Sequence, residues 1–171
     1  MPSSRYLISS QTLGSAAASV TFSSIPATYT DLVLRVSARG DDTAIPVLQM
    51  EINSATSGYS NTLLRGNGST ATSTRSTGQT YLRVGFVNNS GMTASSFGST
   101  EIYIPSYTTS VNKPISAFSV TETNATAADI LAFASLSQTA SAITQIVLSM
   151  AASGQNFVTG SSFYLYGLKN S

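Results

Sequence analysis

The chain has 171 residues, the length of one ordinary domain, and its eight Lys and Arg against seven Asp and Glu give a net charge of +1. The cations form no cluster, which argues against a nucleic-acid partner, and no apolar run approaches the roughly 20 residues that span a membrane. The absence of Cys excludes a disulfide framework and a thiolate metal site. The 31 Ser and 22 Thr residues supply most of the polar groups.

A short N-terminal arm, residues 1–10, begins the chain. Beyond it, apolar and polar residues alternate in short runs that are rich in β-branched and aromatic side chains, which is the pattern of half-buried strands. In the run at residues 30–39, for example, Leu32, Leu34 and Val36 share one face while Arg35 lies on the other. Strands are predicted at residues 18–24, 30–39, 46–53, 79–88, 99–106, 115–123, 142–150 and 162–169.

Two other segments, residues 67–80 and 124–142, do not show this strand pattern as clearly. Residues 67–80 contain almost no apolar side chains, so they are predicted to form an exposed polar loop that becomes ordered against a neighbouring subunit. Residues 124–142 are rich in Ala, which tolerates a helix, but their apolar side chains alternate between two faces, and this favours a strand. Eight to ten short strands joined by turns predict an all-β fold, a single antiparallel β-sandwich or jelly-roll domain over residues 1–171.

The last predicted strand ends the chain and is apolar on both faces. Phe163, Leu165 and Gly167 alternate there with Tyr164 and Tyr166. Because such a strand invites aggregation when it lies at an open edge, we expect it inside a sheet, with its tyrosine face covered by a neighbouring sheet, loop or subunit. Gly167 is predicted to mark a bulge or a close approach of the backbone.

The sequence offers little for catalysis. It has no His or Cys, and its lysines, Lys113 and Lys169, leave a serine nucleophile without an evident base. We therefore expect no enzyme activity, no catalytic residue and no cofactor. Asp41 and Asp42, with Glu51, offer oxygen ligands for Ca²⁺, but no further ligand is spaced near them, so a solvated turn without a metal is the preferred interpretation.

Arginine and tyrosine side chains are the candidates for subunit contacts. In a chain so poor in charge, an outward-facing Arg is a candidate for pairing across an interface, and a Tyr packs in a core or interface or stacks on a sugar. The Arg-Gly-Asp tripeptide at 39–41 is interpreted as a tight turn rather than an adhesion motif. The N-terminal arm and the 67–80 segment are the parts freest to reach a neighbour. The candidate interface residues are Arg5, Tyr6, Arg35, Arg65, Arg75, Arg83, Tyr107, Tyr164 and Tyr166.

Four blocks of sequence carry a resemblance to a known group of proteins. They are "VTFSSIPATYTDLVLRVSAR", "LLRGNGS", "FGSTEIYIPSYTTSVNKP" and "ITQIVL…GSSFYLYGLK", and they cover about residues 18–169 in order. Together they resemble the small β-rich virion proteins of tailed bacteriophages. The resemblance implies a non-enzymatic virion structural protein that assembles in the host cytoplasm.

Two places in the virion fit this resemblance. Because the sequence begins directly at the sandwich, without a repetitive shaft, we expect a capsid decoration (cement) protein that binds and stabilises the assembled head. Its partners are then the major capsid protein or other virion subunits, and a homotrimer at a local three-fold position is the expected form. The alternative is a tail or head-fibre component that recognises a host surface glycan.

Overall fold

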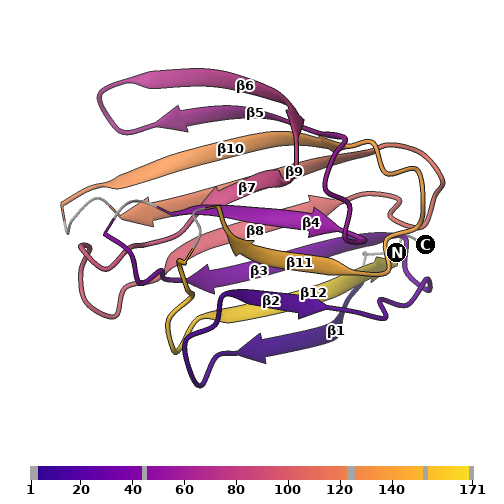
Figure 1. The fold of residues 1–171 in the computed structure, drawn as a ribbon, viewed down its shortest axis with the longest axis horizontal. Coiled ribbons are helices and arrows are strands. Elements are labelled where there is room, and N and C mark those ends of the chain that lie inside the picture. Colours follow the sequence, from indigo (N-terminus) through magenta and orange to yellow (C-terminus); the bar gives the residue numbers. More distant parts are fainter. Residues whose placement is uncertain (1–3, 44–45, 123–125, 152–153, 170–171) are drawn as a thin grey trace.

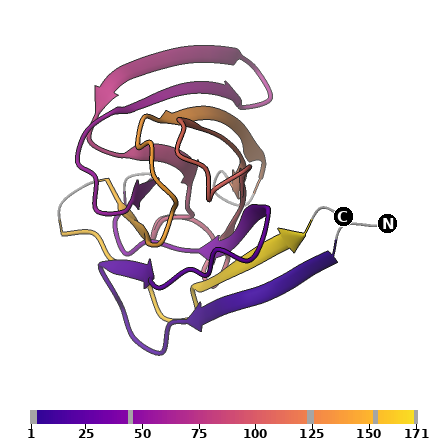
Figure 2. The same ribbon diagram turned by 90° about the vertical axis from the view of Figure 1, so that its right-hand side faces the viewer.

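Two antiparallel β-sheets make up the computed structural model, which describes residues 4–43, 46–122, 126–151 and 154–169. Figures 1 and 2 show the smaller sheet packed against one face of the larger. The predicted all-β sandwich is therefore confirmed, but sheets of eight and four strands do not confirm a jelly roll. The larger sheet has the order β1 (Ser4–Thr12), β12 (Ser162–Lys169), β3 (Asp31–Ala38), β8 (Gly98–Ile104), β9 (Lys113–Glu122), β10 (Ala128–Ser137), β5 (Tyr59–Gly66) and β6 (Ala71–Gln79). The smaller sheet has the order β2 (Ser19–Phe22), β11 (Ile146–Met150), β4 (Val47–Ile52) and β7 (Leu82–Phe86).

Alternation along the strands decides which side chains fill the space between the sheets. In β3, Leu32, Leu34 and Val36 are buried in the core while Arg35 is exposed on the opposite face, as predicted. The alanine-rich segment also forms a strand, β10, which buries Leu131 in the same core. Because each sheet contributes one apolar face, a single core forms between the two layers.

The closing strand β12 lies inside the larger sheet, paired with β1 on one side and β3 on the other. This interior position confirms the prediction. Phe163 and Leu165 are fully buried in the core, whereas Tyr164 and Tyr166 point to the other face. Both tyrosines are partly exposed, so the predicted cover of this face is incomplete within the described residues.

Gly167 marks a close approach, as predicted. The ring of Tyr29 lies over this glycine, and a Cβ atom added there would stand 2.2 Å from Tyr29 Cγ. Tyr6, the residue opposite Gly167 in β1, extends the contact, because its ring centroid lies 5.8 Å from that of Tyr29. The glycine therefore makes room for an aromatic pair where β1 joins the sheet.

Replacing Gly167 by Ala is expected to lower the free energy of unfolding by about 1–3 kcal/mol, because the new methyl group overlaps the Tyr29 ring. Chemical denaturation followed by circular dichroism measures this loss. Gly14→Ala is the matched control, since no described residue apart from Gly14 and its chain neighbours comes within 4 Å of the added Cβ there, and its effect is expected to stay within about 0.5 kcal/mol. Equal effects of the two substitutions would contradict the packing argument.

Side chains of the larger sheet satisfy the outer edge of β7, which pairs with no strand on that side in the part of the chain that the structure describes. The Phe86 N–H donates to Ser119 Oγ at 3.2 Å, and the same hydroxyl donates to the Phe86 carbonyl at 3.1 Å. The Arg83 N–H donates to Asn61 Oδ1 at 2.7 Å, and Ser135 Oγ donates to the Arg83 carbonyl at 3.0 Å. Buried Ser and Asn residues thus join the two sheets where an additional strand would otherwise be needed.

Two predictions about the ends of the larger sheet are wrong. Residues 4–10 of the N-terminal arm belong to β1 and pair with β12, so this part is not a free arm; residues 1–3 lie outside the described residues. Most of the predicted 67–80 loop is strand β6, paired with β5, although its side chains are largely exposed as expected. Main-chain hydrogen bonds form both strands without an apolar face, and the β-branched Thr residues of β6 suit an extended backbone.

Candidate functional site

The outer face of the larger sheet, which points away from the smaller sheet, is rich in exposed apolar side chains. Phe118 lies opposite Glu101 on β8 and Ala132 on β10, and Ala132 lies opposite Leu64 on β5, so these residues share one face. Phe118 remains 51% exposed. We name the central set of exposed residues the Phe118 patch, and it consists of Leu64, Tyr103, Phe118, Val120 and Ile130.

Two hollows flank Phe118 within this patch. One has a volume of about 290 Å³ and lies between Phe118 and Tyr103, with Ala132 in its lining. The other, also about 290 Å³, lies between Phe118, Leu64 and Ile130. Small side chains on neighbouring strands leave these depressions, so the patch presents a half-exposed ring between two hollows whose linings are mainly apolar and include Glu101 in the first and Arg65 in the second.

A polar cluster borders the patch on the same face. Arg35 Nε donates to Glu101 Oε2 at 2.9 Å, and Arg5 Nη1 lies 3.5 Å from the same oxygen. The rings of Tyr164 and Tyr166 stack beside this cluster, with centroids 6.4 Å apart and an interplanar angle of 21°. Four predicted interface residues, both arginines and both tyrosines, are therefore brought together on one face around a carboxylate that the sequence analysis did not single out.

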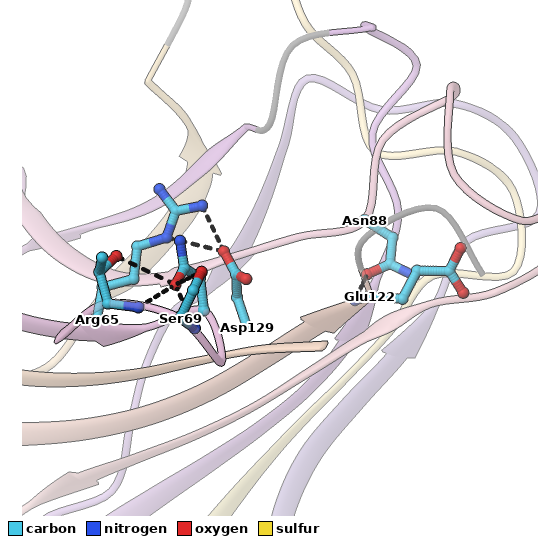
Figure 3. A network of polar contacts seen from close by, with 7 residues as sticks. Arg65, Ser69, Asn88, Glu122 and Asp129 are labelled. Atoms are coloured by element: carbon cyan, nitrogen blue, oxygen red, sulfur yellow. Dashed lines mark hydrogen bonds and ion pairs between the residues drawn. The ribbon is translucent and has the colours of Figure 1, made fainter. Parts of the chain in front are cut away.

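Arg65 forms an ion pair with Asp129 of the same chain. Its guanidinium donates through Nε and Nη2 to Oδ2 of the buried Asp129, and the pair is seen in Figure 3. The guanidinium carbon also lies 5.6 Å from the Phe86 ring centroid. The same figure shows Asn88 beside Glu122, whose N–H donates to Asn88 Oδ1 at 3.3 Å. Arg65 thus helps to hold β5 and β10 against the smaller sheet.

The remaining predicted interface residues are scattered. Arg75 is exposed on the edge strand β6 and donates to Thr62 Oγ1 at 3.2 Å, whereas Arg83 is half-buried on β7. Tyr6 packs on Tyr29 at the other end of the larger sheet. None of these three belongs to the Phe118 patch.

Tyr107 is not an interface residue within this chain, which corrects the prediction. Its side chain is fully buried, its hydroxyl donates to the Pro26 carbonyl, and the Tyr29 N–H donates to the same hydroxyl at 3.4 Å. Burial raises the pKa of the Tyr107 phenol above its ordinary range. Tyr59 is likewise buried, since it is 1% exposed and belongs to the core.

The Arg-Gly-Asp tripeptide is not presented to a partner, because its arginine is buried. Arg39 Nη1 donates to the carbonyls of Thr93 and Ser96 at 2.8 and 3.1 Å. Arg39 Nη2 donates to the carbonyls of Ser90 and Met92 at 3.2 and 3.1 Å. The side chain therefore organises the connection between β7 and β8, a role that nothing in the sequence pattern indicated.

Asp41 and Asp42 accept hydrogen bonds from the connection between β11 and β12. Asp41 Oδ1 accepts the Asn156 N–H at 2.8 Å and Asp41 Oδ2 accepts the Asn156 side-chain amide at 2.9 Å. The Asp42 carboxylate accepts a hydrogen bond from Gln155, at the same connection. Within the described residues, no group of three or more acidic residues could hold a metal ion. The bends at residues 41–43 and the hydrogen bonds of Asp41 agree with a turn at 41–42.

The hydrogen bonds from Asn156 lower the pKa of the Asp41 carboxyl below its ordinary value of 3.8. A lowered folded-state pKa stabilises the protein above the unfolded-state pKa, and this contribution is lost as the pH falls through the folded-state pKa. Asp41→Asn is therefore expected to lower Tm above about pH 5 and to have little effect below about pH 3. Thermal melts across this range test the expectation, and a difference that grows toward low pH would contradict it.

Lys113, the lysine considered as a possible base, is buried at the start of β9. Its ammonium donates to the carbonyls of Thr109 and Val111, which holds the β8–β9 connection. Desolvation lowers the pKa of Lys113 below its ordinary value. Its contacts are those of a structural residue that satisfies two main-chain carbonyls.

The Phe118 patch was not singled out from the sequence, although a signal for it was present. The run 115–123 places apolar residues on both faces, with Ile115 and Ala117 toward the core and Phe118 and Val120 outward. A strand that is apolar on both faces indicates a covered outer surface.

No helix within the described ranges is long and apolar enough to cross a membrane. No protein-family model, curated protein or solved structure matches this chain.

Proposed function

We propose that the protein is a non-enzymatic structural subunit of a phage virion, most specifically a decoration protein that binds and stabilises the assembled head. The observation that carries this proposal is the Phe118 patch, an apolar face that stays exposed in the single chain. Large exposed apolar patches mark surfaces that another polypeptide covers, which is expected of a subunit that works within an assembly. The resemblance of the sequence blocks to small virion proteins directs the proposal toward a phage particle.

The composition of the surface supports the same role. Hydroxyl side chains, rather than charges, provide the polar exterior, and β6 presents an almost uncharged edge. Contacts of this kind depend weakly on salt, because charge screening acts only on ionic interactions. A decoration protein that binds preformed shells stabilises them by mass action, since it has affinity for the assembled state only.

Purified protein is expected to bind empty phage heads and to raise their Tm. The test mixes the protein with shells that lack it, separates bound from free protein by sedimentation, and records melting by calorimetry. Cryo-electron microscopy of intact particles then locates the protein. Density on the tail with none on the head, or shells whose binding and melting are unaffected, would refute the decoration role.

A fibre role is the second candidate, and the stacked pair Tyr164 and Tyr166 favours it. Aromatic rings beside Arg35 and Glu101 combine a stacking surface with hydrogen-bonding groups, which is how proteins hold sugars. A glycan array with wild-type protein and Tyr164→Ala separates the candidates. Binding that disappears in the variant supports the fibre role, whereas an array without binding removes it.

A further inference from the structure

We infer that the Phe118 patch binds a second copy of this chain, so that the protein self-associates through the outer face of its larger sheet. This inference rests on the proposed function in one respect, the need of an assembly subunit to cover an apolar face. It adds the identity of the partner. The argument depends on the shape, the charge and the area of the face.

The shape of the face is complementary to itself. Phe118 protrudes between two hollows, each of about 290 Å³. A cavity of about 150 Å³ holds a benzene molecule, so either hollow accommodates a phenyl ring. Because the protruding ring and the hollows lie on the same surface, two copies can each insert Phe118 beside the other's Tyr103 or Leu64, as a closed symmetric assembly requires.

The charge of the face is compatible with its own copy. In the five strands from β3 to β5, alternation places four charged side chains on this face. Arg35 and Glu101 pair with each other at 2.9 Å, the buried Asp31 accepts the Tyr103 hydroxyl at 2.9 Å, and Glu122 accepts the Thr93 N–H at 2.6 Å. The Phe118 patch itself contains no charged residue. Each of the four charged side chains has a hydrogen-bond partner in its own chain, so the apolar centres of two identical faces meet without an unpartnered charge between them.

The area of the face suits a stable contact. Five strands spaced about 4.8 Å apart, each about eight residues long at about 3.3 Å per residue, give roughly 600 Å² in projection. The accessible surface of protruding side chains exceeds this projection and approaches the roughly 800 Å² per partner of a standard interface. That value is about a tenth of the 8001 Å² total surface of the chain.

Phe118→Lys is expected to disperse the assembly to the 17.8 kDa monomer, measured by sedimentation velocity at about 1–100 μM. The substitution removes the protruding ring and introduces an unpaired charge, and Ile130→Lys, on the same patch, should act alike if the first variant folds poorly. Val111→Lys is the matched control, because Val111 is an aliphatic residue 59% exposed outside the patch. This control is expected to assemble like the wild-type protein.

A cross-linking experiment tests the same contact independently. The chain has no Cys, so Ala132→Cys places a single thiol at the hollow beside Phe118, and a flexible bis-maleimide linker is expected to join two copies covalently. Val111→Cys should give far less of the linked product. Wild-type protein that stays monomeric at every concentration, or an assembly that Phe118→Lys and Ile130→Lys leave intact, would overturn the inference.

Shell binding is measured separately from self-association. A monomeric protein that attaches to shells overturns the inference and leaves the decoration role standing. An assembly that Phe118→Lys disperses but that never attaches to shells supports the inference and refutes the decoration role. A dimer agrees with the inference, because two identical faces meet about a two-fold axis, whereas a cyclic trimer, whose contacts join two different surfaces, would overturn it.

Discussion

A chain truncated at Ser161 is expected to remain unfolded. The deletion removes β12, which places Phe163 and Leu165 in the core and pairs with both β1 and β3. Burial of each side chain contributes about 1.5–3 kcal/mol, and the two ladders that hold β1 and cover the edge of β3 disappear as well. The total is comparable with the roughly 5–15 kcal/mol by which a native domain is stable.

Circular dichroism and the dispersion of amide proton signals measure this effect. A chain that ends at Lys169 is the control, since it keeps all of β12, and it is expected to fold normally. Leu165→Ala provides an intermediate step and should cost about 2–5 kcal/mol, the usual loss for a buried leucine. A cooperative thermal transition in the chain that ends at Ser161 would show that β12 is dispensable.

Arg39→Met is expected to lower the free energy of unfolding by about 3 kcal/mol. The guanidinium donates four hydrogen bonds to main-chain carbonyls of the β7–β8 connection, and its side chain is only 9% exposed. Hydrogen bonds from a charged donor are worth about 1.5–3 kcal/mol each, but the loop carbonyls regain water when the loop relaxes, so the total is smaller than their sum.

The loss of stability depends on the planar geometry of the Arg39 guanidinium as well as on its charge. Arg39→Lys keeps the charge, but an ammonium cannot match the planar arrangement of donors around the four carbonyls, so most of the loss is expected to remain. Arg75→Met removes an exposed arginine from β6 and should change the free energy of unfolding by less than about 0.5 kcal/mol. Denaturant titrations compare the three variants, and an Arg39→Met protein as stable as Arg75→Met would refute this role.

Strands with one apolar face could be located from the sequence because burial leaves a period of two. Leu32, Leu34 and Val36 show this period plainly, and so do Phe163 and Leu165. Strands β1 and β6 could not be located in this way, since most of their side chains are exposed on both faces. Their pairing depends on main-chain hydrogen bonds, which leave no trace in the order of side chains.

The candidate site was predictable only in part, for a related reason. Arg35, Tyr164 and Tyr166 were predicted as interface residues, and the structure brings them together because β3 and β12 are neighbours. Phe118 and Glu101 were not predicted, because membership of the outer face depends on the register of β8, β9 and β10. Tyr107 was misassigned, since a tyrosine in a turn has the same sequence context whether it is buried or exposed.

By itself, the sequence determined the fold class, the faces of the strands that line the core and the interior position of the last strand. These follow from the local period of apolar residues, which depends only on the geometry of an extended chain. The tertiary structure alone decided that Arg39 is buried, that β7 is completed by Ser119 and Asn61, and that the Phe118 patch is left uncovered. Each of these depends on residues far apart in the chain, and only the order and register of the strands determine which of them meet.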